Sequence, residues 1–362
     1  MEKQKKEILR MLESGVITTD EALKLLEAMN DAEKIENTKE ETMEQSLSTR
    51  VLFDEEEKKV YHEQSTVGKV SGFIQNALNK LSKMDFNFTS SVDFTHIFSF
   101  PAADVMGMNI DLFNGSVNIA PHHQDEVRIE CKVKVYKQKD LEEARKIFLD
   151  EVRADVKDRV LRVGSNYKWL KLDTVVYVPK HTYDVARLRL FNGSIRIEEL
   201  SFGKIVGKTA NGNVYLNNII ADDCNMETAN GKIEIIQSEG KKCELETVNG
   251  KIDVQGAFES VEAESVTSGI IVTVTKPLES KVSLKSATGN IECLVPRGIK
   301  VNGELETNFG GFTCDLEAFE VLTEQREKLQ KEMKFQTNRE HLTAITLEAE
   351  SKAGSIFVKH ND

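Results

Sequence analysis

Apolar and polar residues alternate along most of the chain beyond residue 100, which is the pattern of strands that bury one face. The alternation surrounds a short motif whose clearest copies are FNGSIRI (191–197), ANGNVYL (210–216), ANGKIEI (229–235) and VNGKIDV (248–254). Apolar residues usually stand seven and five positions before the glycine and two and four positions after it. Each copy therefore predicts a strand, an Asn-Gly corner and a second strand.

The motif recurs at a nearly constant interval. Gly193, Gly212, Gly231 and Gly250 are 19 residues apart, and the next copies follow at spacings of 19, 20 and 21. A fixed period near 20 residues is typical of a solenoid. We therefore predict a mainly β fold, a parallel β-helix (β-solenoid) with 19-residue coils. Antiparallel hairpins with two-residue Asn-Gly loops are the alternative. The predicted corner residues are Asn114, Gly115, Asn192, Gly193, Asn211, Gly212, Asn230, Gly231, Asn249, Gly250, Gly269, Gly289, Gly310 and Gly354.

Equal spacing predicts that equivalent side chains stack on one another at the strand spacing of about 4.8 Å. The corner asparagines would then form one ladder, and Thr209, Thr228 and Thr247 a second. Asparagine also tolerates the left-handed backbone conformation that a sharp corner requires. The copy around Gly269 is out of step, because its apolar residues come one place early, and a bulge is the predicted cause.

Cysteines and charged residues recur with the same period. Cys224 and Cys243 are predicted to stack, as are Cys293 and Cys314, and buried thiols used as small apolar side chains are the favoured interpretation. Stacked acidic pairs are Glu227 with Glu246 and Glu234 with Asp253, and they alternate with Lys232 and Lys251. Cross-strand ion pairs on a solvated face are the favoured interpretation, and a cation or glycan site is the alternative.

The remaining segments suggest a separate N-terminal module and several helices. Residues 1–30 predict a helical hairpin whose apolar face contains Ile8, Leu9, Leu12, Leu23 and Leu26. Residues 31–66 are an acidic, flexible linker by composition. Residues 67–84 predict an amphipathic helix that caps the first coil or touches a membrane. The solenoid is expected to span 67–362, with helical excursions near 140–156 and 317–334.

Composition narrows the classes of function. The chain has 48 Lys and Arg against 60 Asp and Glu, a net charge of −12, so nucleic-acid binding is not expected. The N-terminus has no apolar signal region, which favours a cytoplasmic location, with association with the membrane or envelope left open. Five cysteines without a CxxC pair fit reduced thiols, and no metal or cofactor is predicted.

Two parts of the chain resemble known families. The VVYVPK…FNGSIRI passage (175–197) resembles the bacterial adhesin-type β-strand-repeat family, a domain of unknown function. KKEILRMLESGVITTDEALKLLEAM (5–29) resembles the short helical domain that precedes it in the YvlB/LiaX-like proteins of Gram-positive bacteria. This resemblance implies a non-enzymatic protein of the cell-envelope stress response, connected with antimicrobial-peptide sensing.

We therefore expect a binding and scaffold protein and not an enzyme. The hairpin would mediate self-association or bind protein partners, and acidic surface would attract a cationic peptide or a basic partner segment. A membrane-associated, adhesin-like structural protein is the alternative. A β-helical carbohydrate-active enzyme is least favoured, because it needs paired carboxylates beside aromatic rings and Trp169 is the only tryptophan.

Overall fold

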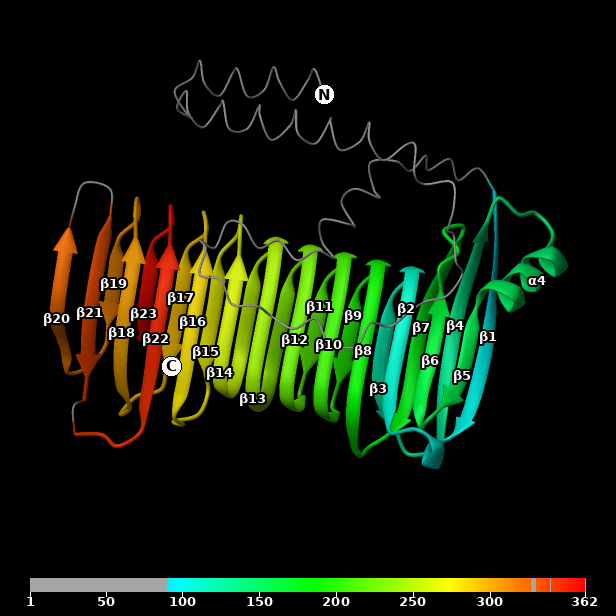
Figure 1. Ribbon diagram of the computed structural model, residues 1–362, viewed down its shortest axis with the longest axis horizontal. Coiled ribbons are helices and arrows are strands. Elements are labelled where there is room, and N and C mark those ends of the chain that lie inside the picture. The colour runs from blue at the N-terminus through cyan, green and yellow to red at the C-terminus, as the bar shows by residue number, and fades with distance from the viewer. Residues whose placement is uncertain (1–89, 327–329, 339, 362) are drawn as a thin grey trace, which may run out of the picture. The chain divides into compact units, whose positions relative to one another are not determined.

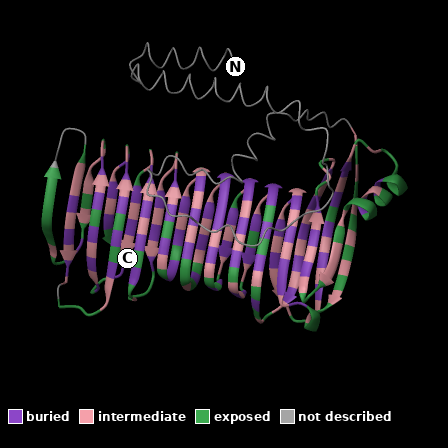
Figure 2. Ribbon diagram, in the orientation of Figure 1, coloured by how far each residue is buried: buried purple, intermediate pink, exposed green. Residues whose placement is uncertain are grey.

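The computed structural model describes residues 90–326, 330–338 and 340–361, and their strands form one long stack (Figure 1). The predicted hairpin (1–30), linker (31–66) and amphipathic helix (67–84) lie outside these residues. Buried and exposed residues alternate along nearly every strand, so that the stack is striped across its whole length (Figure 2). The prediction of a mainly β, solenoid-like fold is therefore confirmed.

The elements follow one another in a simple order. The strands are β1 (Ser91–Pro101), β2 (Gly107–Asn114), β3 (Val117–His122), β4 (Glu126–Tyr136), β5 (Arg153–Lys157), β6 (Val160–Ser165), β7 (Leu170–Pro179), β8 (Thr182–Asn192), β9 (Ile195–Glu198), β10 (Ser201–Asn211), β11 (Val214–Asn217), β12 (Ile220–Asn230), β13 (Ile233–Asn249), β14 (Ile252–Ser265), β15 (Ile270–Val274), β16 (Ser280–Ser286), β17 (Ile291–Val295), β18 (Lys300–Thr307), β19 (Phe312–Asp315), β20 (Phe319–Arg326), β21 (Lys331–Thr337), β22 (Ala344–Ser351) and β23 (Ile356–His360). A short 3-10 helix covers Ala102–Asp104, and helix α4 covers Leu141–Glu151.

A typical coil consists of β10, an Asn-Gly corner and the shorter strand β11. The next coil repeats this arrangement, and residues 19 apart are direct neighbours, as in the parallel pairs Ile205–Cys224 and Val214–Ile233. We call the strands that precede the corners the first face and the strands that follow them the second face. Inward-facing aliphatic residues from both faces form one continuous core along the stack.

The stacking order departs from the chain order at both ends. On the first face β22 lies between β16 and β18, and on the second face β23 lies between β17 and β19. The last coil in the sequence is therefore the last but one in space. The N-terminal end has the same feature, because β2 lies between β6 and β8, and β3 lies between β7 and β9.

The second corner of the coil contains the left-handed residues. Glu199, Asn218 and Gln237, which are 19 apart, have φ values of 54°, 54° and 51°. The next coil lacks this residue, because Ile236 pairs with Gln255 and Ser238 with Gly256. The predicted slip is therefore real: β13 has one residue more than β14 between Ile236 and Ser238, which is the two-against-one register of a bulge. The expectation that the corner asparagines take the left-handed conformation is wrong, since none of them has a positive φ.

The N-terminal end of the stack is covered by a helix. Beyond β6 and β7 the second face continues through β4 to β1, while the first face adds only β5. Helix α4 begins after Asp140, whose side chain accepts a hydrogen bond from the Glu143 amide at 2.9 Å. Its Phe148 is buried and packs edge-on against Phe94 of β1, with ring centroids 5.5 Å apart. The helix predicted within 140–156 is therefore present.

The prediction of a helix at 317–334 is wrong. This segment contributes strands β20 and β21, which form an antiparallel hairpin, and β21 continues the first face beside β18. The mixed acidic and basic residues of this segment are compatible with a helix as well as with a strand, so the sequence pattern alone predicted the wrong element. A strand forms here because the edge of β18 that β22 does not occupy offers backbone hydrogen-bond partners to β21. The buried side chains of Met333 and Phe335 on β21 complete the core at this end.

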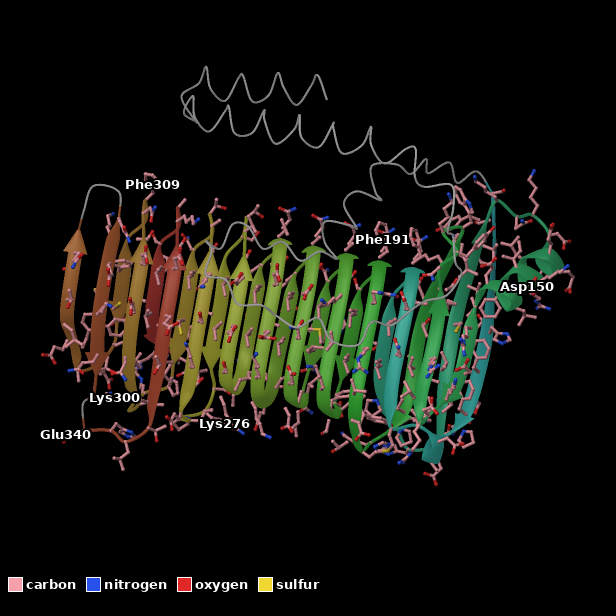
Figure 3. The ribbon with its side chains drawn as sticks, viewed as in Figure 1. Asp150, Phe191, Lys276, Lys300, Phe309 and Glu340 are labelled. Atoms are coloured by element: carbon pink, nitrogen blue, oxygen red, sulfur yellow. The ribbon has the colours of Figure 1, made fainter. Side chains whose placement is uncertain are left out.

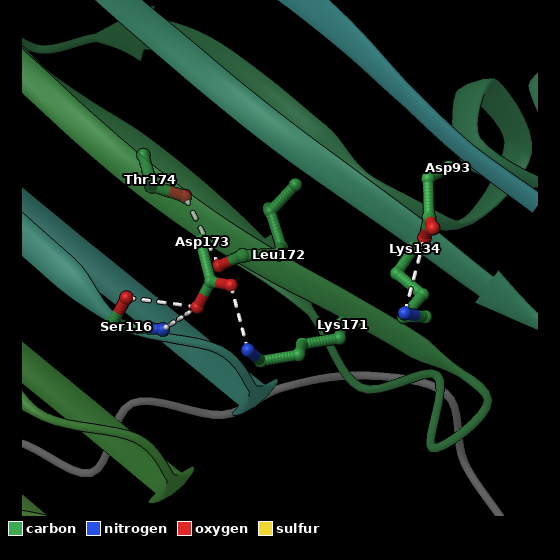
Figure 4. A network of polar contacts seen from close by, with 7 residues as sticks. All are labelled: Asp93, Ser116, Lys134, Lys171, Leu172, Asp173 and Thr174. Atoms are coloured by element: carbon green, nitrogen blue, oxygen red, sulfur yellow. Dashed lines mark hydrogen bonds and ion pairs between the residues drawn. The ribbon is translucent and has the colours of Figure 1, made fainter.

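A carboxylate links the out-of-order N-terminal coil to its neighbour (Figure 4). Asp173 of β7 accepts hydrogen bonds from the amide and the hydroxyl of Ser116, at 2.9 and 2.8 Å, and its other oxygen lies 2.7 Å from Lys171 Nζ. Burial by itself would raise the pKa of Asp173, but the hydrogen bonds from Lys171 and Ser116 outweigh it, so the pKa lies below its usual value.

Replacing Asp173 by Asn should lower the free energy of unfolding at pH 7 by about 1 kcal/mol, because charge-assisted hydrogen bonds are lost. A carboxyl with a depressed folded pKa stabilises the fold above its unfolded pKa of about 4, and this contribution disappears as the pH falls through the folded value. Urea unfolding of the full chain at pH 7 and near pH 3 measures both effects.

The control is Asp93→Asn, because Asp93 is 65% exposed and lies 3.5 Å from Lys134 in a surface ion pair. It should change stability little at either pH. A difference between Asp173→Asn and wild type that stays constant down to pH 3 would contradict this account.

Candidate binding surface

The corner asparagines form a hydrogen-bonded ladder along one edge of the stack. Each side-chain amide donates to the Oδ1 atom of the asparagine in the preceding coil, at 2.9 Å for Asn192 to Asn114 and 2.8 Å for Asn211 to Asn192. The same bonds continue through Asn230 and Asn249. Because the amides satisfy one another, these predicted site residues have a structural role and offer few free groups to a ligand.

The glycines of the corners are required by close approach of the backbone. A Cβ atom built on Gly212 would lie 2.0 Å from the carbonyl oxygen of Gly193. The equivalent contacts place Gly354 between Gly289 and Gly310. The threonines stack in register as predicted, Thr209 beside Thr228 and Thr228 beside Thr247. Their hydroxyls donate to corner carbonyls, that of Thr209 to the Gly193 carbonyl at 2.8 Å, and the other two do likewise.

Replacing Asn211 by Ala should lower the free energy of unfolding by about 1–2 kcal/mol, because it leaves Asn192 without a donor and Asn230 without an acceptor. Denaturant titration compares it with the control Asn217→Ala, in which an outward-facing amide of β11 is removed. If the two variants lose the same stability, the ladder is not the cause.

The cysteines pack as small apolar side chains. Cys224 and Cys243 are neighbours on paired strands and both are buried. The hydrogen bond that the Cys243 thiol donates to Cys224 and burial both raise the pKa of Cys243, and burial raises that of Cys293 to about 12, so these thiols stay protonated. The predicted stacking of Cys293 on Cys314 is wrong, because Val358 of the inserted strand β23 lies between them.

Glutamates concentrate on the outward side of the first face toward the C-terminal end. Glu244 pairs in register with Glu262, and Glu304 pairs with Glu348. The adjacent outward position adds a second row, two residues further along each strand. We call this set the acidic face; its members are Glu244, Glu246, Glu262, Glu264, Glu304, Glu306, Glu348 and Glu350.

Lysines neutralise only part of this face. Lys242 lies 2.6 Å from Glu244, and Lys334 lies 3.0 Å from Glu304. Hydrogen bonds to these glutamates raise the pKa of both lysines. Glu350 forms no hydrogen bond or ion pair within the described part of the chain, and it borders a shallow hollow of about 210 Å³ that Glu304, Glu306 and Glu348 also line.

The first face changes sign toward the N-terminal end. Arg187, Arg189, Lys204 and Lys208 occupy the outward positions of β8 and β10. At the boundary between the two regions Lys208 Nζ lies 2.8 Å from Oε1 of Glu227, a buried residue that is only 8% exposed. Basic residues are therefore more frequent at the N-terminal end of this face and acidic residues at the C-terminal end, although ion pairs such as Arg189–Asp111 and Lys281–Glu348 lie in both parts.

The second face has a different charge pattern. Lys232 pairs with Glu234 at 2.7 Å and Lys251 with Asp253 at 2.8 Å, so that each ion pair lies within one coil and not between neighbouring strands as predicted. The Trp169 ring is covered by Lys137, whose Nζ lies 3.4 Å from the ring centroid. A cation–π contact therefore occupies one face of this ring.

Neither a metal site nor a membrane-spanning helix is found in the part of the chain that the structure describes. No group of three or more His, Cys, Asp or Glu residues in it could hold a metal ion. None of its helices is long and apolar enough to cross a bilayer.

The two edges of the stack bear different groups (Figure 3). Phe191 and Phe309 lie on the edge of the Asn-Gly corners, where Phe309 is 72% exposed, while Lys276 and Lys300 lie on the opposite edge. The first face lies between these edges and bears the acidic face described above. The hairpin residues Ile8, Leu9, Leu12, Leu23 and Leu26, predicted as an interaction face, lie outside the described residues.

These observations define a β-solenoid protein, and comparison with known proteins agrees with this fold. A family model described as Toastrack DUF4097 matches residues 105–358, and a SHOCT-like domain model matches residues 4–34. The uncharacterised protein YvlB of Bacillus subtilis (strain 168) is 37% identical over 368 residues, which cover 100% of both chains. The chain belongs to the Toastrack family.

Solved structures with low sequence identity are also similar. A candidate adhesin from Bacteroides fragilis NCTC 9343 is 12% identical with a TM-score of 0.45, covering 73% of this chain and 97% of that chain. A candidate adhesin from Parabacteroides distasonis ATCC 8503 is 13% identical with a TM-score of 0.39, at coverages of 73% and 97%.

Proposed function

We propose that this Toastrack protein is a non-enzymatic binding scaffold of the bacterial cell envelope, and that its acidic face binds a cationic partner. The partner class is a basic amphipathic peptide, such as a cationic antimicrobial peptide or a basic segment of a membrane protein. The connection with the envelope rests on the family resemblance described above, whereas the binding role rests on the acidic face.

The observation that carries the proposal is the register of like charges on neighbouring strands. Directly opposed like charges destabilise a sheet, so stability alone does not favour placing Glu262 beside Glu244 or Glu350 beside Glu306. A cationic ligand would relieve this repulsion. Its binding would also be favoured by the negative electrostatic potential that several carboxylates produce together. The flat strands of the first face hold these carboxylates at fixed spacing, which reduces the ordering cost of binding.

The chemistry of the described residues favours binding over catalysis. Buried thiols with raised pKa values are poor nucleophiles. The acidic face adjoins a hollow of about 210 Å³ that is open and lined by carboxylates and a lysine, with no aromatic ring in its wall. Such a surface suits a partner that spreads across several coils.

The charge-reversal double variant Glu262→Lys with Glu350→Lys should weaken binding of a fluorescent Lys/Leu amphipathic peptide about tenfold at low salt, with the difference shrinking at high salt. Fluorescence anisotropy with the full chain measures the affinity. The matched control is Glu279→Lys with Glu340→Lys, which makes the same change in net charge at exposed positions away from the acidic face.

Equal loss in the two double variants would reduce the effect to net charge and overturn the proposed site. So would the absence of peptide binding by the wild-type chain at low salt. Flotation with anionic vesicles tests the membrane-associated alternative, because an acidic face should be repelled by such a surface.

A further inference from the structure

At the C-terminal end of the stack the two faces stop at different strands along the stack axis, and each face leaves one strand edge unpaired within the described residues. Coil strands β18 and β19 lie at the same level on the two faces. The hairpin β21–β20 extends the first face two strands further, while the second face stops at β19. Within the described residues β20 pairs only with β21, and β19 pairs only with β23.

The step between the faces exposes the end of the core. The inward side of the hairpin and the last strand border a cavity of about 390 Å³, whose apolar lining residues are Phe312, Cys314, Phe319, Val321 and Met333. Val321 is 42% exposed although it lies opposite the buried Phe335 on the inward side of the hairpin. The part of this apolar side chain that stays in contact with water contributes no hydrophobic stabilisation to the single chain.

The opposite end of the molecule shows how such a step is closed. There the second face extends one strand further than the first, and helix α4 packs Phe148 onto the inward side of the overhanging strand β1. Nothing among the described residues covers the inward side of β20 in the same way. The two ends therefore differ in the one element that closes the core.

We propose that a second copy of this chain closes the C-terminal end, through a twofold axis that runs parallel to the strands between the two faces. This operation keeps the strand direction and exchanges the faces. The hairpin of the partner subunit then occupies the two strand positions that follow β19 on the second face. In the same way, the hairpin of the first copy occupies the two positions that follow β19 of the partner subunit. The contact is isologous and closes after two copies.

The strand directions fit this arrangement. The chain reverses at the corner between β18 and β19, and β20 is antiparallel to β21, which is itself antiparallel to β18. Consequently β20 runs opposite to β19, so that β19 and the partner subunit's β20 would pair as antiparallel strands. The interlock removes both free edges, which otherwise invite uncontrolled edge-to-edge association.

The side chains also suit a second copy. The apolar residues on the inward side of each hairpin would face the same residues of the other copy and form a shared core. Glu324 and Lys331 line the rim of the cavity and lie near each other's level along the strands. The twofold axis would therefore bring opposite charges from the two copies together at the rim.

Sedimentation velocity of the full chain should show a particle of twice the monomer mass at about 10 µM, where a stable isologous dimer is populated. Val321→Asp should raise the dimer dissociation constant at least tenfold, because it places a carboxylate in the shared apolar core. Thr323→Asp is the matched control: Thr323 lies on the same strand opposite Lys334, whose side of β21 faces outward, so this variant should remain dimeric. Circular dichroism should show unchanged folding in both.

Two further measurements identify the interface. A chain lacking residues 1–30 should remain dimeric, which separates this contact from self-association through the predicted N-terminal hairpin. Amides of β19 and β20 should be protected from hydrogen exchange in the wild type and lose protection in Val321→Asp. A monomeric wild type, a dimer that survives Val321→Asp, or a dimer abolished by deletion of 1–30 would each overturn the proposal.

Discussion

The structure depends on the stacking of equivalent residues at the spacing of neighbouring strands. At each corner the backbone of one coil approaches that of the next so closely that a Cβ on Gly212 would overlap the Gly193 carbonyl. This contact sets the register, and the register in turn places asparagine on asparagine and aliphatic residues on aliphatic residues. A shift by one residue would turn the core side chains to the solvent, which explains why the repeat is so regular.

The same constraint distributes charge over the surface. Because the register is strict, any charged residue that recurs with the period becomes part of a row along the stack. Lysine–glutamate neighbours such as Lys208 and Glu227 neutralise each other, whereas repeated glutamates accumulate into the acidic face. A solenoid thus turns a periodic sequence into a surface with a long-range electrostatic pattern, which suits binding of extended charged partners.

The ends of a solenoid are where its regularity becomes a difficulty, since the last strands have unpaired backbone and exposed core. This chain solves the problem differently at its two ends. A helix with a buried phenylalanine, Phe148, covers the N-terminal end. At the C-terminal end a hairpin extends one face only, and the resulting step has the shape and strand polarity to fit a second copy.

The sequence by itself determined the strand–corner–strand unit, the corner residues, the buried positions and helix α4, because these depend on local alternation and on contacts between coils of identical spacing. It could not reveal the hairpin at 319–337 or the places of β22 and β23, which separate Cys293 from Cys314. The strands of every coil have the same pattern, so the sequence does not specify which edge each strand joins. Only the tertiary structure decides this, because strand pairing between distant segments depends on which edges remain free, and the complete acidic face and the stepped C-terminal end follow from that choice.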